Sequence, residues 1–150
     1  MANIDEIKKL REATGVSIAE CKKALDDAKG DINAAKEILK DLGKEFAERK
    51  KERQVQQGII DSYIHPNKKI GALLELRCET DFVAKSDGFR NLAHELCLQA
   101  AAMDPTEDIV SFLDQPWIKD STRTIKDLIN EQIAKLGENI AVRKCVKYEI

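Results

Sequence analysis

The segment from Ile70 to Cys78, together with the motif that follows it, constrains the fold of this chain more than any other stretch. Apolar side chains recur at every second position of the segment, which predicts a strand with one buried face. Thr80 follows the strand, and its hydroxyl can cap a helix by accepting hydrogen bonds from backbone N–H groups. Asp81 and Phe82 would then stand at the start of that helix, at a corner of the fold.

Two interpretations of Phe82 are open from residue chemistry alone. Its ring can fold back beneath the helix and join the core, which is the commoner place for a phenyl group. Alternatively, the ring projects from the corner and inserts into another protein.

The 150 residues are 35% charged and 43% hydrophobic, a balance typical of a soluble globular protein of one or two domains. The formal net charge of −2 gives no electrostatic reason to expect direct binding to nucleic acid. No apolar run approaches the ~20 residues that span a bilayer, and the first residues lack the basic and apolar regions of a signal peptide. We therefore expect a cytoplasmic protein that binds neither membranes nor nucleic acid.

The cysteines and histidines do not form a metal-binding pattern. The four cysteines are far apart and include no C-x-x-C pair: Cys21, Cys78, Cys97 and Cys145. Cys21 and Cys78 fall on apolar faces and are expected to be buried as small hydrophobes. Neither His65 nor His94 has other ligands nearby in the sequence, so we predict no metal site.

Residues 1–43 predict three short helices, with capping residues at Asn3, Ser17 and Asp31 and an end of the third helix at Gly43. The pattern resembles the three-helix bundle of ubiquitin-associated domains. Lys22 should point away from the apolar stripe of the second helix, and simple solvation is the plainest interpretation of such a lysine.

Residues 44–57 are dominated by charges and glutamines and predict a solvated helical linker. Residues 58–150 predict an α+β core. Its expected elements are an antiparallel hairpin, two main helices and a final strand, over 59–64, 70–78, 87–103, 124–136 and 140–148. We expect Met103 on the inner face of the helix over 87–103, and Ile140, Val142, Val146 and Tyr148 in alternation on the final strand. We expect 106–120 to be irregular or weakly helical, with Pro116, Trp117 and Ile118 filling a gap in the core.

The predicted fold is thus a three-helix bundle, a charged helical linker and a three-stranded antiparallel sheet packed with helices. Helices on one face of such a small sheet leave an edge, and one face, in need of cover. Pairing of this core with a second copy of the chain would supply it.

Motifs typical of enzymes are absent. The sequence contains no G-x-G-x-x-G, no G-x-x-x-x-G-K-[ST], no G-x-S-x-G and no H-E-x-x-H. The carboxylates are expected on helix surfaces or at helix caps, so the sequence indicates no catalytic acid–base pair. We predict a protein that is not an enzyme, needs no cofactor and does not itself bind a nucleotide.

Three motifs in order along the chain carry a family resemblance. Thr80-Asp81-Phe82-Val83-Ala84-Lys85 is similar to the signature of the elongation factor Ts family, the nucleotide-exchange factors for elongation factor Tu. The opening motif of that family resembles 10–15 together with 21–25, and its last core motif resembles 136–143. The chain is shorter than the compact forms of the family between Met103 and Ile109, where those carry additional helical sequence.

The resemblance implies a function and its residues. It implies that the chain binds GDP-bound elongation factor Tu, wedges Phe82 beside the nucleotide and Mg²⁺ site, and promotes GDP release. It also implies that one-core members can dimerise through the core. The partner-binding residues implied by matching motif positions are Thr80, Asp81, Phe82, Val83, Lys22, Leu136, Gly137 and Glu138.

Two other functions stay open as alternatives. The three-helix pattern also permits an adaptor that binds ubiquitin-like modifiers, although this leaves 78–85 and 136–143 unexplained. An enzyme with Cys78 or Cys145 as nucleophile is disfavoured, because no histidine stands beside either one in the sequence.

Overall fold

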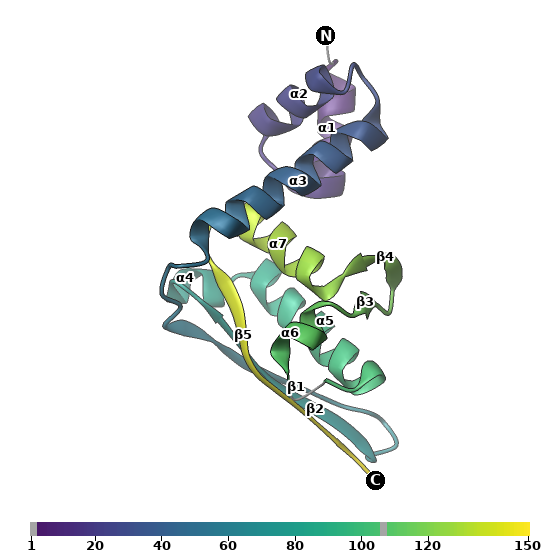
Figure 1. Cartoon of the computed structure of the whole chain (residues 1–150), viewed down its shortest axis with the longest axis vertical. Coiled ribbons are helices and arrows are strands. Elements are labelled where there is room, and N and C mark those ends of the chain that lie inside the picture. The colour runs from purple at the N-terminus through teal and green to yellow at the C-terminus, as the bar shows by residue number, and fades with distance from the viewer. Residues whose placement is uncertain (1–2, 106–107) are drawn as a thin grey trace.

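A computed structural model describes residues 3–105 and 108–150 of the chain. It has a helical bundle at one end and an α+β core at the other, with one long helix running between them (Figure 1). The bundle consists of α1 (Ile4–Thr14), α2 (Ile18–Asp27) and the first half of α3 (Ile32–Lys50). Among the described residues, no helix is long and apolar enough to cross a membrane.

The three helix starts of the bundle were predicted correctly. The side chain of Asn3 accepts a hydrogen bond from Glu6 N, Ser17 caps α2 in the same way, and Asp31 accepts from two amides of α3. The interior of the bundle is small and apolar; its buried residues are Ile7, Leu10, Cys21, Ala24, Leu25, Ala35 and Leu39.

The predicted end of the third helix at Gly43 is wrong, since α3 continues without a break to Lys50. Gly43 is buried, and a Cβ there would lie 3.6 Å from the carbonyl oxygen of Asn130 and 3.8 Å from the Cβ of Ala134. Gly43 therefore lies where α3 packs against helix α7 (Ile125–Leu136), rather than ending the helix. Of the predicted helical linker over 44–57, only the part up to Lys50 is helical, and a turn follows it.

The main sheet is antiparallel with the strand order β1 (Gln57–Ile64), β2 (Ile70–Cys78) and β5 (Ile140–Glu149). The hairpin joining β1 to β2 was predicted. Helices α5 (Asp87–Met103) and α7 pack on one face of the sheet (Figure 1). The buried core between these layers includes Leu74, Leu76, Phe89, Leu96, Phe112, Ile125, Ile133, Ile140 and Val142. This confirms the predicted α+β class.

A bulge in β5 overturns the simple alternation predicted for the last strand. Leu76 pairs with Val142 but the preceding residue of β2 pairs with Lys144, so Arg143 is an extra residue. The bulge exchanges the two faces of the strand beyond this point. Ile140 and Val142 are therefore buried as expected, whereas Val146 and Tyr148 are exposed on the opposite face.

Residues 108–120 are more ordered than predicted, while 106 and 107 lie outside the described residues. A short helix α6 (Ile109–Leu113) precedes a small hairpin of β3 (Pro116–Trp117) and β4 (Asp120–Thr124). The buried side chain of Gln99 fixes this hairpin, since its Nε2 donates to Pro116 O at 3.0 Å and its Oε1 accepts from Ile118 N at 2.9 Å.

The gap-filling role predicted for the segment 116–118 holds only in part. The Trp117 side chain packs partly against the core, but Pro116 and Ile118 are exposed. Met103, predicted on the inner face of α5, is also exposed.

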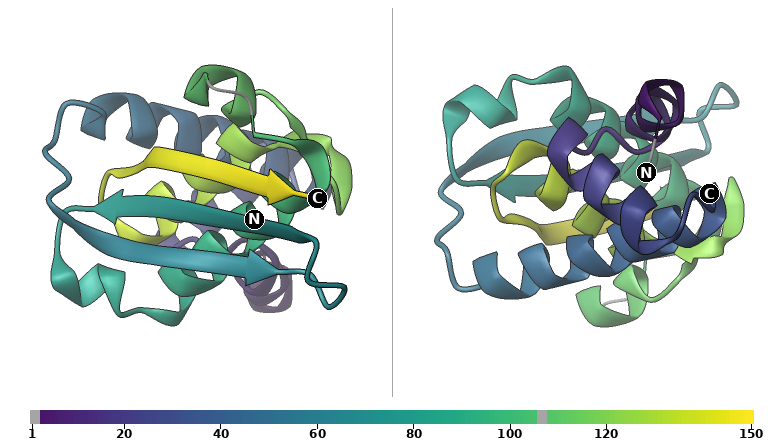
Figure 2. Two further views of the ribbon diagram at one scale, coloured as in Figure 1. Left: turned by 90° about the horizontal axis from the view of Figure 1, so that it is seen from below. Right: turned by 90° about the horizontal axis from the view of Figure 1, so that it is seen from above.

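No helix of the described residues, 3–105 and 108–150, covers the second face of the sheet. Viewed from below in Figure 2, no helix crosses in front of β1, β2 and β5. Exposed apolar side chains on these strands are Ile60, Ile64, Leu73, Val146 and Tyr148. We call this surface the open sheet face.

Candidate functional site

The corner after β2 is built as the sequence predicts. Cys78 ends the strand with a buried thiol, and the hydroxyl of Thr80 accepts a hydrogen bond from Val83 N at 3.3 Å. This cap starts α4 (Asp81–Ala84), a single helical turn. Strand, cap and turn together form a projection with regular secondary structure rather than an irregular loop.

Phe82 projects from this turn and its side chain is 87% exposed. Val83 and Ala84 of the same turn point inward, where both are buried in the core. Asp81 is exposed and forms an ion pair with Lys85 at 2.8 Å. In this structure, the interpretation of Phe82 as a core residue is therefore wrong.

An exposed phenyl ring on a capped helical turn is suited to binding. Burying a phenyl side chain fully in a partner gains about 1.5–3 kcal/mol. Because α4 is held by two buried residues of its own, little ordering of the chain is needed on binding. The corner can thus contribute an aromatic anchor to a protein interface.

The turn between α7 and β5 lies directly against this corner. Gly137 ends α7 in the left-handed conformation with φ 78°. Glu138 then reaches the corner: its Oε1 accepts from Thr80 N at 2.9 Å and its Oε2 from the Thr80 hydroxyl at 2.6 Å. Gly137 is exposed beside these contacts, whereas Leu136 packs partly against the core.

Three residues that the sequence analysis did not single out complete this contact. Glu79 Oε1 accepts from Asn139 N at 2.9 Å and lies 3.6 Å from an Arg53 guanidinium nitrogen. Asn139 is buried and its amide donates to the carbonyl oxygen of Arg53 at 2.9 Å. Glu79 directly precedes the motif 80–85 and Asn139 lies within the motif 136–143, whereas Arg53 lies in neither. Pairs this distant along the chain leave no periodic pattern.

Lys22 is the one predicted site residue that the structure does not bring to the corner. It is exposed on α2, as expected for a residue beside the buried Cys21. The bundle lies at the opposite end of α3 from α4 (Figure 1). A partner would have to span both regions to contact Lys22 and Phe82 together.

The cysteines have no features of nucleophiles. Burial is the main cause that raises the pKa of Cys78 to about 11, of Cys97 to about 12 and of Cys145 to about 11. Burial likewise raises the pKa of Cys21. These thiols are protonated at neutral pH, and thiolate is the reactive form. In the part of the chain that the structure describes, no three histidine, cysteine or carboxylate side chains gather as metal ligands.

A cleft of about 410 Å³ lies between the bundle and the core, where α3 meets β4 and α7. Charges of both signs line it, among them Lys40, Arg123, Asp127 and Glu131. They pair with one another: Lys40 Nζ lies 3.5 Å from Asp127 Oδ2, and Arg123 pairs with Glu131. The ion pair between Lys40 and Asp127 therefore joins α3 to α7 across the cleft.

Comparison with known proteins decides the family. The family model described as "Elongation factor TS" matches residues 79–150, the part of the core that contains the corner and the turn. The chain is 42% identical to elongation factor Ts of Thermotoga petrophila, over 99% of this chain and 96% of that protein. The chain belongs to the elongation factor Ts family.

Other members of the elongation factor Ts family give the same result. Identity is 38% to the protein of Coprothermobacter proteolyticus, over 96% of this chain and 95% of the relative. The identity to the protein of Herpetosiphon aurantiacus is also 38%, over 99% of this chain and 97% of that relative. The alignment with the Thermotoga petrophila protein is 190 positions long, whereas this chain has 150 residues, so at least 40 positions of that alignment have no counterpart here. The chain is thus a shortened member of the family.

Proposed function

We propose that this chain promotes GDP release from elongation factor Tu by inserting Phe82 beside the nucleotide site of that protein. Elongation factor Ts is the nucleotide exchange factor for elongation factor Tu, to which it binds, and it is not an enzyme. The observation that carries the proposal is the exposure of Phe82, which is 87% accessible on a turn whose other apolar residues are buried.

The proposed mechanism is displacement rather than chemistry. Insertion of the ring would shift elements of elongation factor Tu that hold Mg²⁺, and the phosphate charge of GDP would then be less well neutralised. Bound GDP and bound exchange factor would weaken each other by the same factor, because coupling between two binding sites is reciprocal. Entering nucleotide would therefore release this chain unchanged.

The remaining site residues have graded roles in this proposal. Asp81 and Thr80 lie on the exposed surface beside Phe82, and Gly137 lies exposed next to them, so all three would meet the partner at the rim. Val83 would support the turn from within the core, and Leu136 would contribute only the part of its side chain that is accessible. Lys22 would form a separate contact through the bundle.

The proposed division of labour follows the predicted domains. Residues 1–43 would dock on the nucleotide-binding domain of elongation factor Tu, residues 44–57 would connect, and residues 58–150 would carry the wedge. Because α3 runs through the first boundary, the bundle and the core would approach the partner in a fixed relative orientation. A second copy of the chain is the proposed cover for the open sheet face, which would form a homodimer through the core.

The function is tested by the release of a fluorescent GDP analogue from elongation factor Tu. We expect substoichiometric amounts of this chain to accelerate release of all the bound nucleotide, because the factor is recycled. Acceleration that stops at one release per molecule of the chain, or no acceleration by the folded chain, would contradict recycling exchange.

A further inference from the structure

We infer that Glu138 is a positioning residue that holds Phe82 in place, rather than a contact to the partner. It acts together with Glu79 and Asn139 in a reciprocal pair of contacts, which we call the corner clamp. The inference rests on the proposed function, since it explains how the wedge is held.

The carboxylate of Glu138 is turned toward its own chain. Its Oε1 accepts from the backbone N–H groups of Glu79 and Thr80, at 3.1 Å and 2.9 Å. Its Oε2 accepts from the Thr80 hydroxyl at 2.6 Å, a short charge-assisted bond. Both oxygens are therefore engaged at the point where β2 gives way to α4.

The hydroxyl of Thr80 has two tasks in this geometry. It donates to Glu138 and at the same time accepts from Val83 N, which caps α4. Donation to the carboxylate orients the hydroxyl so that its lone pair faces the helix. Glu138 thus sets the direction in which the turn bearing Phe82 leaves the strand.

The second half of the clamp runs in the opposite direction. Glu79 Oε1 accepts from Asn139 N at 2.9 Å, so each segment places a carboxylate on the backbone of the other. The Asn139 amide donates to the carbonyls of Lys51 at 3.4 Å and Arg53 at 2.9 Å, in the segment that follows α3. The clamp therefore connects the corner with the helix that enters from the bundle.

A single helical turn needs such support. One turn of helix is unstable by itself, because nucleation fixes several residues for one hydrogen bond. Without the clamp, only the buried Val83 and Ala84 would hold α4, and the additional ordering needed on binding would reduce the gain from insertion of the ring. The clamp keeps Phe82 in a fixed direction relative to the bundle, so that Phe82 and Lys22 can contact elongation factor Tu at the same time.

A double-mutant cycle on GDP release separates this role from direct contact. We expect Glu138→Ala to slow exchange by about tenfold or more, as loss of hydrogen bonds to a charged group would. In a Phe82→Ala background, Glu138→Ala should add little further loss, because it acts through the ring. Losses that multiply in the double variant would overturn the inference and assign Glu138 to the interface instead.

Two further readouts guard against a merely structural effect. Glu138→Gln keeps one acceptor oxygen for the amides of Glu79 and Thr80 but cannot accept from the Thr80 hydroxyl, so it should recover part of the exchange rate. Glu52→Ala removes an exposed carboxylate of the adjacent segment and should change nothing. In the free chain, hydrogen exchange at the amides of Glu79 and Thr80 should be faster in Glu138→Ala and restored in Glu138→Gln. Unchanged protection of these amides in Glu138→Ala would contradict the clamp.

The outcomes also distinguish this inference from the proposed function. If Phe82→Ala exchanges GDP like the wild type, the wedge fails and the clamp fails with it. If Phe82→Ala loses exchange but Glu138→Ala in that background still multiplies the loss, only the clamp fails. Should Glu138→Ala not fold, the same cycle with Glu79→Ala tests the reciprocal half.

Discussion

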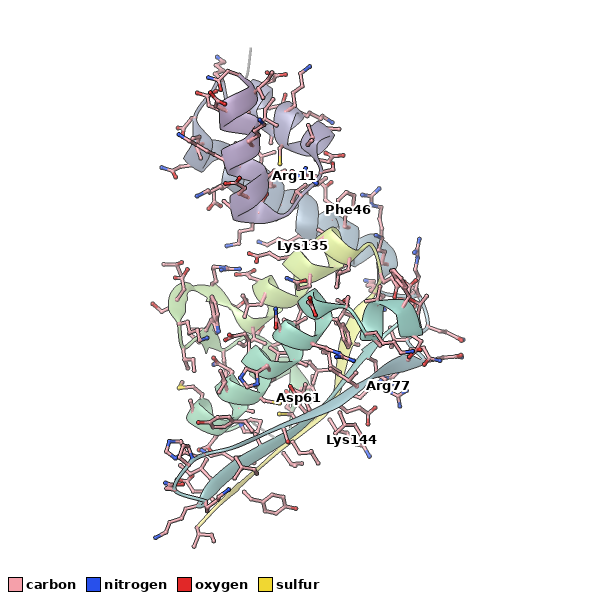
Figure 3. All side chains as sticks on the ribbon, turned by 180° about the vertical axis from the view of Figure 1, so that it is seen from behind. Arg11, Phe46, Asp61, Arg77, Lys135 and Lys144 are labelled. Carbon is pink, nitrogen blue, oxygen red and sulfur yellow. The ribbon has the colours of Figure 1, made fainter. Side chains whose placement is uncertain are left out.

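The side chain of Lys135 lies against Gly15, the residue that ends α1. A Cβ on Gly15 would stand 2.1 Å from Lys135 Cε, so the last turn of α7 and the end of α1 are in direct contact. Figure 3 places Lys135 where α7 faces the bundle. Its ammonium group lies near the C-terminal end of α1, where a positive charge is favourable. The bundle is therefore fixed to the core at a second point besides α3.

We expect Gly15→Ala to destabilise the chain more than Gly30→Ala. Both glycines have positive φ, 71° and 86°, so both substitutions carry a backbone penalty of about 1–2 kcal/mol. Only Gly15 adds the contact with Lys135, since nothing lies within 4 Å of a Cβ at Gly30. Urea unfolding of both variants measures the difference. Equal losses would mean that the Lys135 contact contributes nothing.

Gly43→Ala should stabilise the chain by about 0.5–1 kcal/mol. Alanine is the better residue inside a helix, and the added Cβ would meet α7 at ordinary contact distances of 3.6 Å or more. Gly43→Leu should instead push α3 away from α7 and lower the unfolding temperature. Thermal unfolding of both variants tests this, and a leucine variant as stable as the alanine variant would show that the helices do not need close approach.

Asp127 should make the joint between α3 and α7 sensitive to acid. Burial acts to raise its pKa, but the Thr124 amide and the Lys40 ammonium outweigh burial and hold the pKa below its usual value. A carboxyl whose pKa is lowered by folding stabilises the fold above its unfolded pKa of about 3.9, and that contribution disappears as pH falls through the folded value.

The corresponding test compares Asp127→Asn with the wild type across pH. We expect the free energy of unfolding of the variant to be about 1 kcal/mol lower at pH 7, as for loss of one hydrogen-bonded charge. This difference from the wild type should disappear at low pH. Asp41→Asn, at an exposed position on α3, is the matched control. A difference in the free energy of unfolding that stays the same down to acid pH would show that the Asp127 charge does not stabilise the joint.

The open sheet face should hold two copies of the chain together. Leu73 and Val146 pair across β2 and β5 in the middle of that face, and both are exposed. Lys144 projects on the same side (Figure 3). Leu73→Glu should shift the chain toward monomer in sedimentation equilibrium, whereas Val110→Glu, at an exposed position on α6, should not. A wild-type chain that remains monomeric at high concentration would contradict the homodimer.

Local signals were sufficient for much of the fold. Asn3, Ser17, Asp31 and Thr80 cap helices because the groups they satisfy lie within the next few residues. The β1–β2 hairpin likewise depends on a short turn between alternating segments. Such features are readable from sequence because cause and consequence are close together.

The features of the fold that the sequence did not predict depend on residues far apart along the chain. Gly43 is a helix breaker by local propensity, yet α3 packs against α7 at this residue and continues through it to Lys50. The bulge at Arg143 depends on register with β2, and the order of β3 depends on Gln99. The bonds from Glu138 to Thr80 cross 58 residues, so the motif predicted a contact patch without its internal geometry.

The central claim is that Phe82 drives nucleotide release. The most direct measurement compares release of a fluorescent GDP analogue from elongation factor Tu in the presence of wild type, Phe82→Ala and Val110→Ala. Val110 is the control because it is also an exposed apolar residue but lies on α6. Loss of an aromatic anchor costs about 2–4 kcal/mol, so Phe82→Ala should lose most of the acceleration while keeping wild-type helical content, and Val110→Ala should keep both. Full acceleration by a folded Phe82→Ala would contradict the claim.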